Sequence, residues 1–281
     1  MNTEEKATVL IVEDHPLTIY TLIEYLKKIG LQISVARSGE EALRQVKTLQ
    51  PDLILLDIMM PGIDGFETCR GLKGSFDTKD IPVIFITALA DTANKVKAFE
   101  AGGTDYITKP FDLKEVAARI ETRLTIQRLQ RRLHVRNLSF IMPEKTEKAS
   151  ILVAEDNEMT LQVICGYLEK LGFQTTKTTT GEGVLNYLKE HTLPDVILLD
   201  VMMPGIDGFE ACRQIKANPK TRGIPVIFMT ALTDMSHKVA AFEAGGSDYI
   251  TKPHHYAEVL ARVNTHLTLR TLQKLLRKRS E

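Results

Sequence analysis

The stretch LLDIMMPGIDGFE, residues 55–67, decides the fold, and it returns at residues 198–210 as LLDVMMPGIDGFE. In both places an apolar run ends in an aspartate, Asp57 or Asp200. Residues 57–109 align with residues 200–252 without a gap at an offset of 143, and 36 of the 53 aligned positions are identical. Upstream the offset is 142, because Asp14 pairs with Asp156. The chain therefore contains two copies of one domain.

Length and composition agree with two ordinary soluble domains. The 281 residues suit about two domains, and the hydrophobic and charged fractions are 43% and 26%. Basic and acidic residues both number 36, so no net charge draws the chain to nucleic acid or to an anionic membrane. No apolar run reaches the roughly 20 residues of a membrane span, and the start lacks a signal peptide. The expected location is cytoplasmic. Three cysteines without CxxC spacing argue against disulfides and zinc and are expected to be buried: Cys69, Cys165 and Cys212.

Short apolar runs alternate with amphipathic segments in each copy. In the first copy strands are predicted at 8–12, 32–36, 52–57, 81–87 and 104–108, and helices at 16–29, 39–48, from about 64, at 91–101 and from 113. Strands that are apolar almost throughout suit a parallel sheet covered by helices on both faces. The sequence thus predicts two doubly wound α/β domains, each a five-stranded parallel (βα)5 unit ending in an extended helix.

The terminal helices run past what one domain needs. Residues 113–142 contain neither Gly nor Pro, and a helix of about 26 residues there would be roughly 40 Å long. Two interpretations stay open: a coiled-coil arm, or a helix end lying on its own domain with a solvated basic face. The linker is expected at PEKTEK, residues 143–148. The predicted limits are 7–125 for the first domain, 126–148 for its helical extension and linker, 149–268 for the second domain and 269–281 for the last extension.

Polar residues end the predicted strands at the edge where ligands bind in open parallel sheets. They are Glu13, Asp14, Asp57, Thr87 and Lys109 in the first copy and Glu155, Asp156, Asp200, Thr230 and Lys252 in the second. Three converging carboxylates need a compensating cation, and oxygen ligands without His or Cys suit Mg²⁺. A lysine and a threonine can bind phosphoryl oxygens. The pattern predicts a phosphoryl-transfer site with a carboxylate nucleophile.

Together the motifs VEDHP and AEDNE, the LLD(I/V)MMPGIDGFE block, the TAL threonine and the YITKP lysine resemble the receiver domain of bacterial two-component response regulators. The tandem is similar to the receiver portion of two-receiver diguanylate cyclases or hybrid kinases. The resemblance implies a flavodoxin-like fold in each copy, with Asp57 and Asp200 accepting phosphoryl groups from phosphohistidine. It also implies bound Mg²⁺, held by these aspartates, by the acidic pairs and by two backbone carbonyls: Glu13, Asp14, Glu155, Asp156, Met59 and Met202.

The resemblance implies further roles around each aspartate. Thr87 with Tyr106, and Thr230 with Tyr249, would form switch pairs that reorient on phosphorylation. Ala88 and Ala231 would leave room for the phosphoryl group, and both Lys-Pro bonds are expected to be cis. One departure is His254-His255, where the first copy has Phe111-Asp112. Two exposed residues starting a helix are the favoured interpretation over a proton-transfer or metal role.

The leading hypothesis is a signalling protein, not an enzyme, whose partner is a sensor histidine kinase or a histidine phosphotransfer protein. Its output would be altered docking or dimerisation, through the terminal helices or receiver faces, without nucleic acid or membrane contact. Self-phosphorylation with Mg²⁺ and slow autodephosphorylation are expected. One alternative is the regulatory fragment of a diguanylate cyclase or kinase. Another is an aspartyl-phosphate phosphatase, disfavoured because Met59 and Met202 stand where that class has a second aspartate. Two sites could read two kinases, set a threshold or pass phosphate unequally.

Overall fold

The computed structural model describes residues 6–88, 92–133, 148–231, 235–252 and 255–280. The chain divides into two compact units, Met1–Gln127 and Arg128–Glu281, here called the N-terminal and C-terminal units. The buried side chains of each unit form clusters within that unit, so each unit has a hydrophobic core of its own.

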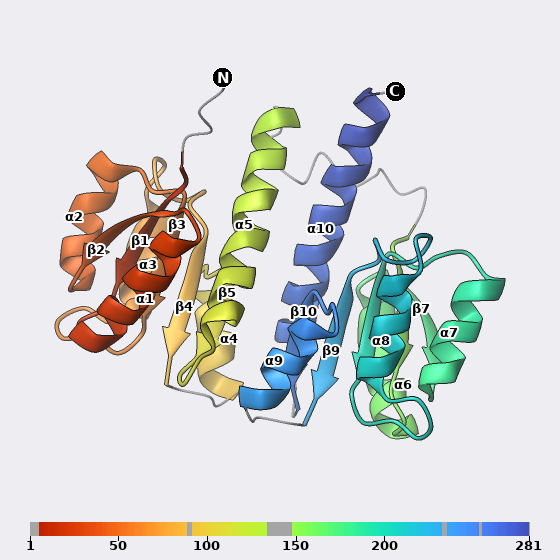
Figure 1. The fold of residues 1–281 in the computed structure, drawn as a ribbon. Helices are drawn as coiled ribbons and strands as arrows, with labels where there is room; N and C mark the ends of the chain where they lie inside the picture. Colours follow the sequence, from red (N-terminus) through yellow and green to blue (C-terminus); the bar gives the residue numbers. More distant parts are fainter. Residues whose placement is uncertain (1–5, 89–91, 134–147, 232–234, 253–254, 281) are drawn as a thin grey trace. The chain divides into compact units, whose positions relative to one another are not determined.

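The N-terminal unit alternates strands and helices along the chain (Figure 1). Its strands form one parallel sheet in the order β2-β1-β3-β4-β5. The elements are β1 (Thr8–Val12), α1 (Pro16–Lys28), β2 (Gln32–Ala36), α2 (Gly39–Leu49), β3 (Leu53–Asp57), α3 (Gly65–Gly74), β4 (Val83–Thr87), α4 (Thr92–Glu100), β5 (Asp105–Thr108) and α5 (Leu113–Leu133).

The C-terminal unit repeats the same plan, with its sheet in the order β10-β9-β8-β6-β7. Its elements are β6 (Ser150–Ala154), α6 (Glu158–Lys170), β7 (Gln174–Thr178), α7 (Gly181–Glu190), β8 (Val196–Asp200), α8 (Gly208–Ala217), β9 (Val226–Thr230), α9 (Met235–Glu243), β10 (Asp248–Thr251) and α10 (Tyr256–Ser280). The two doubly wound five-stranded domains predicted from the sequence are confirmed.

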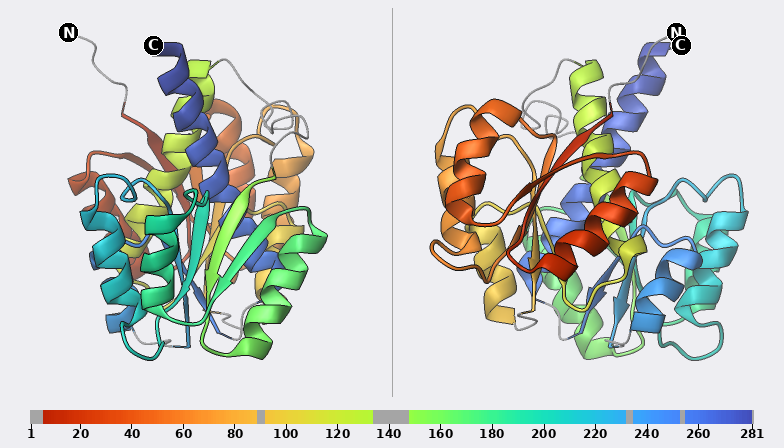
Figure 2. Two further views of the ribbon diagram at one scale, coloured as in Figure 1. Left: turned by 90° about the vertical axis from the view of Figure 1, so that its right-hand side faces the viewer. Right: turned by 60° about the vertical axis from the view of Figure 1, so that its left-hand side comes forward.

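Alternate residues of the central strands supply the two faces of each sheet. In β1, Leu10 and Val12 join the core under α2 and α3, whereas Val9 and Ile11 join the core under α1 and α5. Helices lie on both faces of each sheet in the views of Figure 2. A strand covered on both faces has no solvent side, which explains the apolar runs that ended in Asp57 and Asp200. All three cysteines are buried and free, as the sequence predicted.

Capping side chains and proline set the limits of several elements. Asp64 accepts a hydrogen bond from the backbone N–H of Glu67 at 2.7 Å, so α3 begins at Gly65. Asp207 caps α8 in the same way at 2.7 Å. The predicted strand at 81–87 begins instead at Val83, directly after Pro82, which has no N–H to donate to a neighbouring strand.

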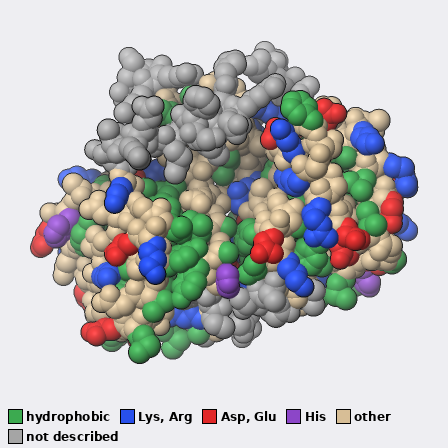
Figure 3. All heavy atoms as spheres, turned by 180° about the vertical axis from the view of Figure 1, so that it is seen from behind, with side chains coloured by type: hydrophobic (Ala, Val, Ile, Leu, Met, Phe, Trp, Pro, Cys, Tyr) green, Lys and Arg blue, Asp and Glu red, His purple; other side chains and the backbone are tan. Residues whose placement is uncertain are grey.

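The last helix of each unit is long. α5 extends to Leu133, and the helix and linker predicted for residues 134–147 lie outside the described residues. Within the described ranges, no helix is both long and apolar enough to span a membrane. Figure 3 shows basic and acidic side chains interspersed over the described surface that it displays.

Candidate functional site

The carboxyl ends of two strands bring the predicted acidic residues together in the N-terminal unit. Ligand oxygens of Glu13, Asp14 and Asp57 all lie within 4.8 Å of one another. β1 pairs directly with β3, and Glu13 and Asp14 follow β1 while Asp57 ends β3. Parallel pairing therefore places these carboxylates at one edge of the sheet. Glu13 and Asp57 are buried, at 1% and 5% exposed, whereas Asp14 is partly exposed.

Lys109 completes this cluster from the end of β5. Its Nζ lies 2.8 Å from Asp57 Oδ2 and 2.7 Å from Glu13 Oε2. The peptide bond between Lys109 and Pro110 is cis, as expected. Lys109 is thus a single cation shared by two buried carboxylates.

The C-terminal unit builds the same cluster from β6, β8 and β10. Ligand oxygens of Glu155, Asp156 and Asp200 lie within 4.8 Å of one another. Lys252 Nζ lies 2.7 Å from both Asp200 Oδ2 and Glu155 Oε2. The second bond expected to be cis joins Lys252 to Pro253, and Pro253 lies outside the described residues.

The electrostatics of both clusters follow from burial. Burial raises the pKa of Glu13 and of Glu155 above the usual value, and the neighbouring lysine opposes this rise only in part. Burial by itself would lower the pKa of Lys109, but hydrogen bonds to Asp57 and Glu13 outweigh it and raise that pKa. The same holds for Lys252 with Asp200 and Glu155. Each cluster contains two buried carboxylates and one lysine.

The turn after each aspartate approaches the strand closely. The backbone N–H of Met59 points at Asp57 Oδ1 at 3.4 Å, and that of Met202 points at Asp200 Oδ1 at 3.3 Å. A Cβ on Gly65 would lie 2.3 Å from the carbonyl oxygen of Asp57, and one on Gly208 would lie 2.2 Å from that of Asp200. Glycine is needed because α3 and α8 start against the aspartate's own backbone.

The threonines predicted for this edge end β4 and β9. Thr87 and Thr230 are 2% and 3% exposed, and the small residues Ala88 and Ala231 follow them at exposed positions. Tyr106 is buried at 5% exposed, with its ring edge-on to Phe99 at 6.0 Å. Tyr249 is equally buried and meets Phe242 at 6.1 Å. Both tyrosine rings are thus held in the cores of their units, under α4 and α9.

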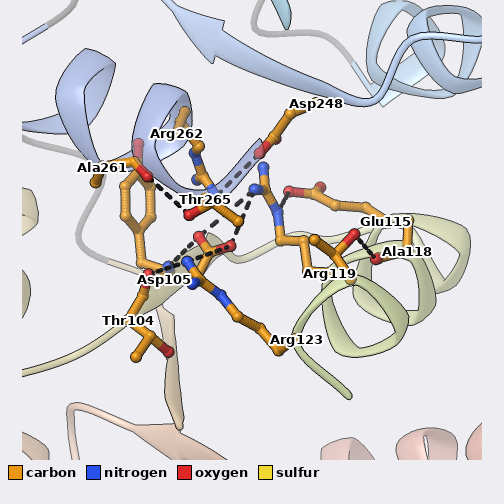
Figure 4. A network of polar contacts seen from close by, with 12 residues as sticks. Thr104, Asp105, Glu115, Ala118, Arg119, Arg123, Asp248, Ala261, Arg262 and Thr265 are labelled. Carbon is orange, nitrogen blue, oxygen red and sulfur yellow. Dashed lines mark hydrogen bonds and ion pairs between the residues drawn. The ribbon is translucent and has the colours of Figure 1, made fainter. Parts of the chain in front are cut away.

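Sequence reasoning missed a buried charged pair on β5 and α5. Arg119 Nη1 lies 3.5 Å from Asp105 Oδ2, and its Nε lies 3.1 Å from Glu115 Oε1 (Figure 4). Arg123 also hydrogen-bonds to the carbonyl of Thr104.

The C-terminal unit has the corresponding pair, with Arg262 Nη1 3.5 Å from Asp248 Oδ2. His266 stands at the position of Arg123 and lies 3.3 Å from Asp248 Oδ2. The signal was available in the sequence, because both pairs keep the offset of 143 that relates the two copies.

A five-stranded parallel sheet with a buried aspartate, an acidic pair and a lysine at its carboxyl edge defines a class of proteins, the phosphoacceptor α/β domains of signalling chains. The profile of the family described as "Response regulator receiver domain" matches residues 9–121 and 151–264. The chain belongs to this family, and it contains the domain twice.

Known proteins resemble either the whole chain or one copy. Response regulator PleD of Caulobacter vibrioides is 29% identical over 280 residues, which cover 96% of this chain and 61% of that protein. The DNA-binding dual master transcriptional regulator RpaA of Synechocystis is 39% identical over 41% of this chain and 48% of its own length. The chain thus spans less than two thirds of these relatives. The solved receiver domain of a signal transduction histidine kinase from Syntrophus aciditrophicus is 39% identical, with a TM-score of 0.41, over 42% of this chain and 90% of that chain.

Proposed function

We propose that the chain is a tandem receiver that accepts phosphoryl groups on Asp57 and Asp200 from the phosphohistidine of a sensor kinase or a phosphotransfer protein. The observation that carries the proposal is the repeated cluster. Lys109 Nζ lies 2.8 Å from Asp57 in the N-terminal unit, and Lys252 Nζ lies 2.7 Å from Asp200 in the C-terminal unit. A carboxylate held beside a cation at a sheet edge is arranged to bind and attack a phosphoryl group. Such donors are made with ATP, which supports a cytoplasmic location.

The transfer itself is a substitution at phosphorus. One carboxylate oxygen of Asp57 attacks the phosphorus atom, and the bond from phosphorus to the donor's imidazole nitrogen breaks. The electron pair stays on the imidazole, and the product is an acyl phosphate on Asp57. Lys109 then exchanges part of its contact with Asp57 for a phosphoryl oxygen, because the ammonium carries several donors. Lys252 has the same role beside Asp200.

The acidic residues fit a hard divalent cation. The donors at each site are carboxylate oxygens within 4.8 Å of one another, and Mg²⁺ prefers such ligands. Glu13, Asp14 and Asp57 would hold it in the N-terminal unit, and Glu155, Asp156 and Asp200 in the C-terminal unit, with the carbonyls of Met59 and Met202 as further ligands. Bound Mg²⁺ would supply positive charge for the incoming phosphoryl oxygens. Each site has two buried carboxylates beside one lysine, which leaves negative charge for a cation to compensate.

Phosphorylation would change the packing of side chains in the core of each unit. A phosphoryl group adds about two negative charges, and Thr87 and Thr230 end strands at the same edge. Thr87 and Thr230 would turn toward the phosphoryl group, and the buried rings of Tyr106 and Tyr249 would reorient with them. The output of phosphorylation would be a change in protein contacts, and slow loss of the phosphoryl group would end the signal. In a longer chain, the same change would regulate an appended cyclase or kinase domain.

The test is intact-protein mass spectrometry after incubation with acetyl phosphate and Mg²⁺. We expect two phosphoryl additions to the wild-type chain, one to Asp57→Ala, one to Asp200→Ala and none to the double variant. Omitting Mg²⁺ should prevent the additions. Two additions to the double variant would contradict the proposed acceptors, and release of many phosphates per protein from small phosphate esters would favour a phosphatase instead.

A further inference from the structure

A glutamate in the first turn of α2 is hydrogen-bonded to the loop that follows β3, residues 58–64. Glu40 Oε1 accepts a hydrogen bond from the backbone N–H of Ile63 at 3.1 Å. In the C-terminal unit, Glu182 in the first turn of α7 accepts one from the N–H of Ile206 at 2.9 Å, in the loop of residues 201–207 that follows β8. Each glutamate thus ties the start of one helix to a loop whose other end adjoins the aspartate of the acidic cluster.

A glycine in each loop makes room for the glutamate. Gly62 has φ of +83°, and a Cβ there would lie 2.5 Å from Glu40 Oε1. Gly205 has φ of +77°, and a Cβ there would lie 2.5 Å from Glu182 Oε1. The backbone of both loops therefore passes so close to the carboxylate that a side chain at this position would occupy the same space, and the left-handed backbone conformation also favours glycine.

The short segment between the two ends of each loop borders the acidic cluster. At one end, the carbonyl of Ile58 accepts a hydrogen bond from Gly65 N–H at 2.9 Å, and at the other end Glu40 holds Ile63. Between them, the N–H of Met59 points at the carboxylate that ends β3, at 3.4 Å. The corresponding distances in the C-terminal unit are 3.0 and 3.3 Å. The glutamate therefore fixes the far end of the segment that begins beside the aspartate.

The two copies keep this contact although the surrounding sequence differs. Four of the ten residues of α7 are identical to their counterparts in α2 at the offset of 142, and Glu182 is one of them. The contact spans 23 residues in the N-terminal unit and 24 in the C-terminal unit, because the copies differ in length by one residue between the helix and the next strand. The hydrogen bond to the loop thus recurs in a helix whose other positions have largely changed.

We propose that Glu40 and Glu182 are positioning residues for the divalent cation of the two phosphoacceptor sites. Each holds in place the loop whose backbone carbonyl, that of Met59 or Met202, is assigned to the cation. Without the hydrogen bond the loop has more conformations, and the cation must order it on binding, which lowers affinity. The carboxylate ligands and the lysine are unaffected, so the reaction at saturating cation persists. This inference rests on the proposed function, which assigns Mg²⁺ to these sites.

The experiment measures Mg²⁺ affinity and phosphorylation separately in the full chain. Asp200→Ala serves as the parent, so that the N-terminal site is observed by itself. Calorimetric titration gives the dissociation constant for Mg²⁺, and intact mass gives the rate of labelling by acetyl phosphate as a function of Mg²⁺. We expect Glu40→Ala to raise the dissociation constant about fivefold, as loss of one hydrogen bond that orders a ligand would suggest. The rate at saturating Mg²⁺ should stay close to that of the parent.

Matched variants separate the hydrogen bond from the charge. Glu40→Gln keeps an oxygen acceptor and should restore most of the Mg²⁺ affinity. Glu41→Ala removes a charge from the same helical turn, but Glu41 accepts from Arg37 N–H at 2.6 Å, outside the loop, so affinity should be unchanged. Glu182→Ala, with Asp57→Ala as its parent, should weaken Mg²⁺ binding at the C-terminal site. An unchanged dissociation constant in Glu40→Ala, or an equal loss in Glu40→Gln or Glu41→Ala, would overturn the proposal.

The calorimetric titration does not depend on phosphorylation, so the two proposals can fail separately. If neither aspartate is labelled by acetyl phosphate but Glu40→Ala still weakens Mg²⁺ binding, the proposed function fails and the positioning role stands. If both aspartates are labelled and Mg²⁺ affinity is the same in Glu40→Ala as in its parent, the positioning role fails and the proposed function stands. A wild-type chain that binds no Mg²⁺ contradicts the positioning role as well.

Discussion

At the scale of single residues, the notable feature is how unevenly charge is balanced around Asp57. Lys109 is shared between Asp57 and Glu13, at 2.8 and 2.7 Å. Burial still leaves the pKa of Glu13 raised. A carboxyl with a raised pKa in the folded state favours folding at low pH, and this contribution is lost as the pH rises through the folded-state pKa. At neutral pH without a divalent cation, ionised Glu13 is therefore unfavourable to the fold.

We predict that Glu13→Gln weakens Mg²⁺ binding at the N-terminal site by about tenfold or more, since one charged ligand is lost. In the absence of Mg²⁺ the variant should unfold at the same temperature as the wild type or higher, because Asp57 remains as the partner of Lys109. Calorimetric Mg²⁺ titration and thermal unfolding check the two expectations.

Glu155→Gln is the matched control, and it should weaken Mg²⁺ binding at the C-terminal site instead of the N-terminal site. Two unchanged Mg²⁺ sites in Glu13→Gln would show that Glu13 is not a ligand, directly or through water. A lower unfolding temperature without Mg²⁺ would show that Glu13 mainly holds Lys109.

At the scale of elements, α10 settles for its own unit a question that the sequence left open. Val259, Val263 and Leu267 are buried in the core of the C-terminal unit with residues of β6 and β8. Further along, Lys274 Nζ lies 2.9 Å from Asp195 Oδ1, and Arg270 Nη1 donates to the carbonyl of Asp195 at 3.0 Å. The helix thus lies on its own unit as far as Lys274, which favours the second of the two interpretations over a free arm.

We predict that Asp195→Asn loosens the end of α10 and lowers the free energy of unfolding by about 1–2 kcal/mol, as expected for charged hydrogen bonds that are partly exposed. Burial would raise the pKa of Asp195, but Lys274 and the Ser150 N–H outweigh it and lower that pKa. The stabilisation is therefore present above the unfolded-state pKa and lost as the pH falls through the folded-state value. Urea unfolding at pH 7 and in acid measures it.

The difference in the free energy of unfolding between the wild type and Asp195→Asn should shrink toward zero in acid. Lys274→Gln should reproduce part of the loss, since Arg270 and the backbone N–H of Ser150 still contact Asp195. A difference that grows as the pH falls would contradict this assignment.

At the scale of the whole molecule, each unit contains a complete sheet, two core layers and one acidic cluster. The buried clusters of the N-terminal unit contain no residue of the C-terminal unit among the described side chains, and the reverse also holds. The chemistry proposed for Asp57 is assigned to Glu13, Asp14 and Lys109, which all follow strands of one sheet. Each unit therefore has its own core and its own acidic cluster.

We predict that a fragment of residues 1–133 folds by itself and is phosphorylated by acetyl phosphate at the rate of the N-terminal site in Asp200→Ala. Circular dichroism, thermal unfolding and intact mass provide the comparison, with the Asp57→Ala fragment as control. An unfolded fragment, or one that reacts at least tenfold more slowly, would show that the C-terminal unit supports the first site.

The sequence alone determined the repeat, the fold class and the members of the acidic clusters. It could do so because the carboxyl ends of parallel strands converge on one edge of the sheet, so that order along the chain predicts proximity. The burial of both faces of the central strands could also be predicted, because the apolar runs that end in Asp57 and Asp200 lack polar alternation.

Only the tertiary structure decided which groups touch. The sharing of Lys109 between Glu13 and Asp57 joins segments far apart in the chain. The close approach of Gly65 to Asp57 and the buried pair of Arg119 with Asp105 join consecutive elements. The contact of Lys274 with Asp195 depends on side-chain direction as well. Local sequence sets the elements, but distances of a few ångströms follow from how those elements pack.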